Sequence, residues 1–269
     1  MANAQFAAQA LAALRKQNPL IHNITNYVVM NFTANTLLAM GASPVMAHAA
    51  EEVEEMVGFA GALVLNIGTL SGAWIEAMLI AGRKASRIGV PVVLDPVGAG
   101  ATTLRTQSAA RIIDAVKPSV IRGNASEIMA LHQAGTMTKG VDAVHRVEDA
   151  TQAARQIARD QGCVVAVTGA VDYITDGQQA YKVTNGDAML GRVTGTGCAA
   201  TAAIGAFLAV ETDALKAVTA ALAFFGLAGE KAREAASAPG SFSMALIDAL
   251  YTVSPDDLAG LARIEAAQA

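Results

Sequence analysis

Residues 62–67 read Ala-Leu-Val-Leu-Asn-Ile and end at Gly68, and this short apolar run decides the fold because it recurs. Comparable runs lie at 91–95, 120–122 and 163–168. Helix-length segments separate them, at 74–88, 103–116, 124–131 and 147–160. Continuous apolar runs are typical of strands covered on both faces, and strands that alternate with helices build a parallel sheet. We therefore predict an α/β fold, a mostly parallel sheet flanked by helices on both faces.

The pattern changes on either side of this alternating region. Residues 172–175 and 180–183 flank an Asp-Gly turn and predict an antiparallel hairpin. Beyond the hairpin the chain is predicted to be mainly helical. Residues 19–26 and 41–47 are predicted loops, and the first of them caps a helix that ends at Met40. Because no linker, repeat or low-complexity tract interrupts the chain, we expect one domain over residues 1–269.

The composition argues against several classes of function. The chain has 269 residues, is 53% hydrophobic and 4% aromatic, and carries a net charge of −4 without a Lys/Arg cluster. Nucleic acid and anionic membranes are therefore not expected partners. The N-terminus does not read as a secretory signal. Glycines and threonines in the uncharged stretch 193–210 favour a buried helix over a membrane span, so we expect a cytoplasmic protein.

Cysteine and histidine usage argues against a metal site built from these residues. The two cysteines, Cys163 and Cys198, form neither a disulfide framework nor a metal-binding pair. The histidines are scattered along the chain, at His22, His48, His132 and His145. No ligand spacing connects them.

A glycine-rich stretch leads into a long apolar segment. Residues 191–198 read Gly-Arg-Val-Thr-Gly-Thr-Gly-Cys, and the apolar segment continues to Val210. Gly195 and Gly197 allow a sharp turn around Thr196, and the N–H groups and dipole of the following helix favour a phosphate there. The alternative is a tight turn without a ligand. Cys198 falls in the first helical turn, where the dipole favours a thiolate that accepts a proton or attacks a substrate; alternatively, it is a small buried side chain.

Polar residues end the predicted strands, where the ligand crevice of an open α/β sheet lies. Asp95 either terminates its strand or holds Mg²⁺, directly or through water, near phosphates. Asn124 and Glu127 have the spacing of a helix N-cap and capping box. The same Glu127 carboxylate can order the waters of Mg²⁺ while Arg122 clamps a phosphate. The spacing leaves both interpretations of Glu127 open. Thr168 is the polar residue that ends the run at 163–168.

Six motifs in this order resemble the hydroxyethylthiazole kinases of the ribokinase-like superfamily, and the resemblance covers nearly the whole chain. The motifs are Pro-Leu-Ile-His-Asn-Ile-Thr-Asn from Pro19, Gly-Ala-Ser-Pro-Val-Met from Gly41, Asn-Ile-Gly-Thr-Leu from Asn66, Asp-Pro-Val-Gly-Ala-Gly from Asp95, Arg-Gly-Asn-Ala-Ser-Glu from Arg122 and Gly-Thr-Gly-Cys from Gly195. The resemblance implies a ribokinase-like fold and ATP-dependent phosphorylation of the primary hydroxyl of 4-methyl-5-(2-hydroxyethyl)thiazole, in thiamine salvage. It also implies Mg²⁺ and a homotrimer with active sites between subunits.

The resemblance also implies roles for individual positions. Substrate contacts fall on Met46, Asn23, Val28 and Gly195. Nucleotide contacts fall on Arg122 and Thr168, and Mg²⁺ is handled by Asp95 and Glu127. The catalytic positions are Thr196, Gly197 and Cys198 in the glycine corner. Most ribokinase-like enzymes have Asp where Cys198 stands, so the identity of the base stays open.

Other activities share parts of this pattern. A related vitamin-precursor kinase would phosphorylate hydroxymethylpyrimidine or pyridoxal. The ATP-dependent NAD(P)HX dehydratase also has a ribokinase-like fold, but an Asp is expected in its glycine corner. A cysteine hydrolase would use Cys198 as nucleophile, although no histidine partner is evident from the sequence. A thiazole-binding module without catalysis is the remaining alternative.

Overall fold

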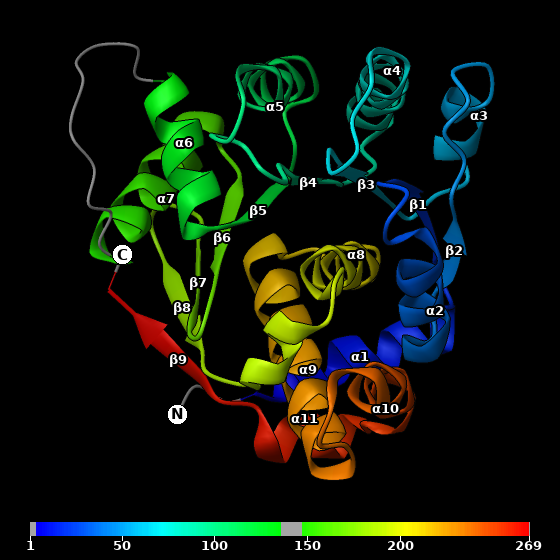
Figure 1. Ribbon diagram of the computed structural model, residues 1–269, viewed down its shortest axis with the longest axis vertical. Coiled ribbons are helices and arrows are strands. Elements are labelled where there is room, and N and C mark those ends of the chain that lie inside the picture. Colours follow the sequence, from blue (N-terminus) through cyan, green and yellow to red (C-terminus); the bar gives the residue numbers. More distant parts are fainter. Residues whose placement is uncertain (1–3, 136–146, 269) are drawn as a thin grey trace.

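The computed structural model describes residues 4–135 and 147–268. Its strands are β1 (Leu20–Ile24), β2 (Ser43–Val45), β3 (Ala62–Asn66), β4 (Val92–Asp95), β5 (Val120–Asn124), β6 (Val164–Thr168), β7 (Asp172–Thr175), β8 (Ala180–Val183) and β9 (Ile264–Ala267). They form one sheet in the order β2-β1-β3-β4-β5-β6-β7-β8-β9 (Figure 1). β1 to β6 pair in parallel, and β7 to β9 pair antiparallel. The prediction of a mostly parallel sheet is confirmed.

Two layers of helices enclose the sheet (Figure 1). One layer contains α3 (Val53–Val57), α4 (Gly72–Ile88), α5 (Thr103–Val116), α6 (Ala125–Gly135) and α7 (Val147–Gln161). The other contains α1 (Gln5–Gln17), α2 (Met30–Met40), α8 (Thr196–Leu208), α9 (Ala214–Ala235), α10 (Pro239–Thr252) and α11 (Pro255–Leu261). Successive strand residues point to opposite faces, so Val64 packs in the second layer and Leu63 in the first. Helices on both faces are thus confirmed.

Three strands were not predicted, and they lie toward the two edges of the sheet. β1 and β2 fall in predicted loops, and β9 falls in a segment predicted to be helical. In β1, the polar residues His22 and Asn23 are fully buried, so no continuous apolar run marks the strand. β2 contains Pro44, which an edge strand tolerates. In β9 only Ile264 is buried, so its sequence carries little strand periodicity.

The remaining predicted elements form, with small shifts of their ends. β7 and β8 confirm the hairpin, and α5 has the predicted bounds. α4 begins before the predicted start because Ser71 caps it, with its Oγ accepting a hydrogen bond from the Trp74 N–H at 3.3 Å. α8 confirms the buried helix expected within 193–210. Among the described residues, none of the helices combines the length and apolar character needed to span a bilayer.

Candidate active site

The carboxyl ends of β3, β4, β5 and β6 bring polar side chains to one edge of the sheet. Asn66 and Asp95 are partners in the register of β3 and β4, and Asn124 and Thr168 are partners in that of β5 and β6. The loop after β1 adds Asn26, whose Nδ2 donates to Asn66 Oδ1 at 2.8 Å. The edge predicted from the strand ends is therefore a connected polar site.

Asp95 is the centre of this edge and is fully buried. Its Oδ2 accepts hydrogen bonds from Asn66 Nδ2 and from Thr201 Oγ1 of α8, both at 2.8 Å. Arg122 Nη1 lies 3.7 Å from the same oxygen. Burial raises the pKa of Asp95 to about 6, although the Arg122 charge opposes that rise. Asp95 Oδ1 has no hydrogen-bond partner among the described residues.

Arg122 joins this carboxylate to the first turn of α8. Its Nη2 donates to Thr168 Oγ1 at 2.6 Å, and its buried Nε has no partner within the described chain. A Cβ added to Gly197 would lie 3.0 Å from Arg122 Nη1. The guanidinium therefore lies directly against the helix backbone, and only a glycine leaves that much room.

The glycine corner has the sharp turn that was predicted. Gly195 has a φ of +86° and is the N-cap of α8, and no side chain caps the helix. A Cβ on Gly195 would approach Val29 Cγ1 to 2.6 Å. Thr196 Oγ1 donates to the Leu190 carbonyl at 2.8 Å. The uncapped first turn leaves N–H groups of α8 for an anion, since helix N-termini lack intrahelical acceptors there.

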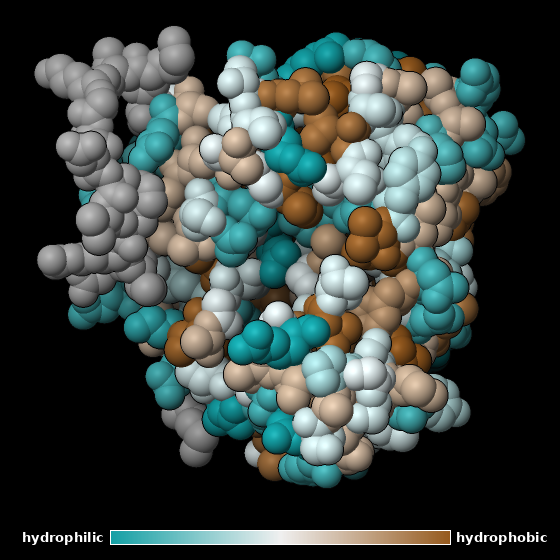
Figure 2. All heavy atoms as spheres, in the orientation of Figure 1, coloured by the Kyte–Doolittle hydropathy of each residue, from teal (hydrophilic) through white to brown (hydrophobic). Residues whose placement is uncertain are grey.

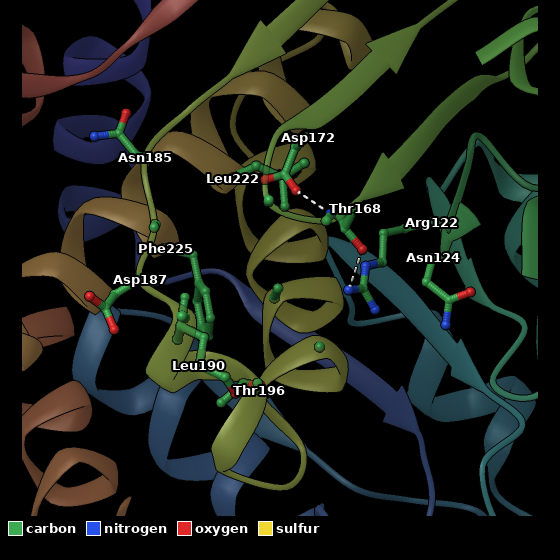
Figure 3. Close-up of a pocket in the computed structure, with 18 residues that line it drawn as sticks. Arg122, Asn124, Thr168, Asp172, Asn185, Asp187, Leu190, Thr196, Leu222 and Phe225 are labelled. Carbon is green, nitrogen blue, oxygen red and sulfur yellow. Dashed lines mark hydrogen bonds between the residues drawn. The ribbon is translucent and has the colours of Figure 1, made fainter. Parts of the chain in front are cut away.

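A cavity of about 520 Å³ begins at this corner (Figure 3). Arg122, Thr168, Thr196 and Gly197 line the end nearest the sheet edge, and Leu222 and Phe225 of α9 supply apolar walls. The space-filling view is hollowed near its centre, between the part that carries β5 and β6 and the part that carries α8 (Figure 2). One end of the cavity therefore suits an anion, and its α9 walls suit a flat apolar group.

Cys198 lies in the first turn of α8, as predicted, but not as a thiolate. Asn26 Nδ2 lies 3.6 Å from its Sγ. Burial, together with the nearby Asp95 charge, raises the pKa of Cys198 to about 11. The expectation that the helix dipole favours the thiolate is therefore wrong: desolvation and a neighbouring carboxylate outweigh it, and the thiol is protonated at neutral pH.

Glu127 satisfies the capping-box interpretation. Its N–H donates to Asn124 Oδ1 and its Oε2 accepts from the Asn124 N–H, both at 2.9 Å. Its Oε1 accepts from the Gly98 N–H at 2.8 Å. Glu127 also contributes to the raised pKa of Asp95, which places the two carboxylates near each other. Each carboxylate oxygen has two lone pairs, so these bonds leave capacity for ordered water.

The donor set is compatible with Mg²⁺ accompanied by phosphates and water. Mg²⁺ is usually bound by one or two carboxylates, with water and substrate phosphates completing its coordination. Asp95 Oδ1 is buried without a described partner, as a group reserved for such a ligand would be. Among the described residues, no three His, Cys, Asp or Glu side chains cluster to form a metal site by themselves. His145 lies outside the described residues.

None of the positions expected to contact the acceptor substrate lines the cavity. Asn23 is buried in β1, where Nδ2 donates to the Ile21 carbonyl and Oδ1 has no described partner. Val28 is 63% exposed in the turn before α2. Met46 follows β2, and its carbonyl is 3.1 Å from His48 Nδ1. Gly195, which contacts Val29, is the position that connects this region to the glycine corner.

Several residues of the site had no predicted role, among them Asn66, Thr201, Asp172 and Arg105. Thr201 bonds Asp95 from the second turn of α8, and Asp172 lines the cavity from β7. Arg105 of α5 donates to the carbonyls of Ile67, Val97 and Gly68 at 3.0, 2.7 and 2.6 Å. It thereby holds together the loops that follow β3 and β4. No sequence pattern links Arg105 to those loops, because the contacts are tertiary.

Known proteins resemble the chain over nearly its full length. The model of the hydroxyethylthiazole kinase family matches residues 11–256. A hydroxyethylthiazole kinase of Desulfotalea psychrophila is 57% identical, covering 98% of this chain and 96% of that relative. One from Chloroflexus aurantiacus is 54% identical, with 96% of each chain covered.

Solved structures also resemble this chain. The hydroxyethylthiazole kinase structure from Pyrococcus horikoshii has a TM-score of 0.90 and 48% identity, over 98% of this chain and 99% of that one. A Staphylococcus aureus pyridoxal kinase structure, with AMP-PCP and pyridoxal, has a TM-score of 0.66 over 93% of this chain and 99% of that one. Its identity is only 17%, so it supports the ribokinase-like fold alone. The chain belongs to the hydroxyethylthiazole kinase family.

Proposed function

We propose that this protein transfers the γ-phosphoryl group of ATP to the primary hydroxyl of 4-methyl-5-(2-hydroxyethyl)thiazole, as a step of thiamine salvage. Family membership supports the reaction. One structural observation carries it: Arg122 lies against the uncapped first turn of α8, between a cavity of nucleotide size and the buried Asp95. Phosphoryl transfer depends mainly on positioning and charge neutralisation, which this arrangement supplies.

In this proposal the nucleotide occupies the cavity. Arg122 and Thr168 contact its phosphates, and Arg122 offers a buried Nε that has no hydrogen-bond partner among the described residues. The N–H groups of Thr196 and Gly197 form the anion hole that stabilises the transferred group. Leu222 and Phe225 flank the adenine.

Asp95 and Glu127 are the residues that would hold Mg²⁺ between them and the phosphates. When bound, the ion would neutralise phosphate charge and orient the transferred group. At pH 7 most Asp95 side chains are ionised, because the pKa of Asp95 is about 6. The carboxylate also holds Arg122 and, through Thr201, the first turns of α8 in place.

The acceptor hydroxyl is proposed to approach Cys198 from the side of β1 and β2. Met46, Asn23, Val28 and Gly195 form its binding site. Because the pKa of Cys198 is about 11, the thiol orients the hydroxyl and does not remove its proton beforehand. A loose transition state needs little base strength, since the hydroxyl proton can leave late in the transfer.

The assembly proposed for this chain is a cytoplasmic homotrimer with active sites between subunits. The exposed Tyr27 and Val28 support it, being 65% and 63% exposed beside the proposed thiazole site. A neighbouring subunit would cover these apolar side chains and close the site over the neutral ring. Nucleic acid and membranes are not proposed partners.

The direct test is an ADP-release assay with the thiazole alcohol, in the presence and absence of Mg²⁺. We expect ADP formation that requires both the alcohol and Mg²⁺. Pyridoxal, hydroxymethylpyrimidine and hydrated NADH serve as competing substrates in parallel reactions. Faster ADP release with any of these three, or thiazole binding without ADP formation, would contradict the proposed activity.

A further inference from the structure

Asp172 places a carboxylate in the wall of the nucleotide cavity, at the start of β7. Its Oδ1 accepts a hydrogen bond from the Gly169 N–H at 3.0 Å. No described residue donates a hydrogen bond to its Oδ2, which leaves that oxygen available to a ligand. Burial raises the pKa of Asp172 to about 6, with opposition from the Arg122 charge, so the group is mostly ionised at pH 7.

An ionised carboxylate close to a phosphate site is unfavourable unless it binds a donor. Asp187 is the other acidic residue that lines this cavity, and its carboxylate already has partners close by. It caps the short 3₁₀-helix Ala188–Arg192 by accepting from the Met189 N–H at 2.8 Å, and it lies 4.0 Å from Arg233. Asp172 has no such ion pair in the described structure, and its remaining acceptor is unused.

The position of Asp172 along the cavity indicates which part of a nucleotide it meets. Through Gly169 it adjoins Thr168, which is bonded to Arg122 at the phosphate end. In Figure 3, Asp172 and the apolar Leu222 are drawn together, with Thr168 and Arg122 on one side of them and Phe225 on the other. In a nucleoside triphosphate the ribose lies between the phosphates and the base. Ribose hydroxyls are neutral donors, which a carboxylate recognises in other nucleotide sites.

We infer that Asp172 Oδ2 accepts a hydrogen bond from a ribose hydroxyl of the nucleotide and thereby selects ribonucleotides over deoxyribonucleotides. This inference rests on the proposed function, because it assumes that ATP occupies this cavity. In this inference the two carboxylate oxygens of Asp172 have separate roles. Oδ1 holds the Gly169 turn next to Thr168, and Oδ2 binds the ribose hydroxyl.

The test compares ATP, 2′-deoxy-ATP and 3′-deoxy-ATP as phosphoryl donors for the thiazole alcohol. The wild type should prefer ATP over at least one deoxy analogue by roughly 10- to 100-fold in kcat/KM, the range for a hydrogen bond to a charged group. Asp172→Ala should reduce this preference to less than about threefold, whereas Asp172→Asn should retain an intermediate preference because its amide oxygen is a neutral acceptor. Asp187→Asn, the matched control in the same cavity, should keep the wild-type preference.

Three results would overturn the inference: equal use of ATP and both analogues by the wild type, equal losses on all three donors in Asp172→Ala, or loss of preference in Asp187→Asn alone. Equal losses would mean that Asp172 only holds the Gly169 turn. Calorimetric binding of ADP, 2′-deoxy-ADP and 3′-deoxy-ADP repeats the comparison without an acceptor substrate. Absence of turnover with intact ADP preference would therefore reject the proposed function and leave this inference standing.

Discussion

At the residue scale, the active-site edge depends on a carboxylate that the fold keeps away from water. Asp95 has two close hydrogen bonds, to Asn66 and Thr201, and only a longer contact with Arg122. Its pKa rises because these partners do not fully replace hydration. The site therefore holds a charged group at a cost in stability, which is common where a carboxylate must meet a ligand.

Asp95→Asn should make the protein more resistant to unfolding, by an amount that increases with pH. The native state holds the Asp95 proton more tightly than the unfolded chain does, because the pKa rises from 3.8 to about 6. Wild-type stability therefore falls as pH rises through this interval, by about 3 kcal/mol for this group. Asparagine has no carboxyl group to titrate. The difference in the free energy of unfolding between the variant and the wild type should therefore widen from pH 4 to pH 7.

Urea unfolding of both proteins at pH 4, 5, 6 and 7 measures this difference. A difference independent of pH would show that Asp95 is not protonated more readily in the folded protein. The variant should also lose most of its kinase activity at pH 7, because it no longer presents a negative charge to Arg122 and to the proposed Mg²⁺.

Cys198→Asp should keep the wild-type turnover or raise it by up to about tenfold, since a carboxylate accepts a proton more readily than this thiol. The new carboxylate would lie near Asp95, which already raises the pKa of Cys198. Like charges raise each other's pKa, so the acidic limb of the kcat profile should move to higher pH. Steady-state kinetics between pH 5 and 9 test both expectations. A folded variant without activity would argue against a proton acceptor at this position.

Among the helices, α8 lies between the proposed nucleotide site and the proposed acceptor site. Its first turn provides the proposed anion hole, and Thr201 one turn later bonds Asp95. Gly195 adopts a left-handed conformation that L-residues rarely adopt, and it packs against Val29 on the proposed acceptor side. Gly197 packs against Arg122 on the nucleotide side. In the proposed reaction, this one helix terminus would therefore set the separation between the nucleotide and the acceptor.

Gly197→Ala should lower the kinase activity without lowering the stability of the protein. Alanine favours a helix over glycine by up to about 1 kcal/mol, so the free energy of unfolding should be unchanged or slightly higher. Its Cβ would lie 3.0 Å from Arg122 Nη1, which forces the guanidinium to shift. We expect kcat/KM for ATP to fall by about tenfold, equivalent to one hydrogen bond to a charged group.

Gly72→Ala is the matched control for this change. Gly72 is also in the first turn of a helix, α4, and a Cβ there meets no atom within 4 Å. It should therefore leave the kinetics unchanged. Wild-type ATP kinetics in Gly197→Ala would show that the close approach of Arg122 to α8 has no role in nucleotide binding.

At the scale of the whole molecule, the two helical layers have different roles. The layer of α3 to α7 covers the sheet, while the layer with α8 and α9 also supplies the proposed anion hole and apolar walls of the cavity. The proposed acceptor site lies at the β1 and β2 side of the sheet, beside the exposed Tyr27 and Val28. An assembly that covers these residues would complete the site.

Val28→Asp should disrupt the proposed trimer, because a buried unpaired charge at a subunit interface is costly. Light scattering after size exclusion should give three times the 27.5 kDa chain mass for the wild type and a smaller mass for the variant. Thiazole affinity should fall with it. Leu104→Asp is the control: Leu104 is similarly exposed, at 57%, but lies on α5 in the other layer. A monomeric wild type, or equal effects of both substitutions, would contradict this assembly.

The central sheet, the helices between its strands and the glycine corner could be predicted from the sequence, because apolar runs, helix caps and paired glycines act locally. The motif at 122–127 allowed the capping box formed by Asn124 and Glu127 as one of two interpretations, and the structure contains it. Local signals could not reveal β1, where buried polar residues hide the strand, or β9, where one buried side chain supports the pairing.

The electrostatics of the site and the set of residues that line the cavity depend on tertiary contacts and could not be predicted from the sequence. Cys198 is at a helix N-terminus, as its sequence context indicates, but burial beside Asp95 reverses the expected shift of its pKa. Arg105 bonds to loops remote from its own predicted helix, and Asp172 shares a cavity with residues of several distant elements. The physical reason is common to all three. Desolvation and hydrogen bonding depend on which distant groups share a small volume, and spacing along the chain does not encode that directly.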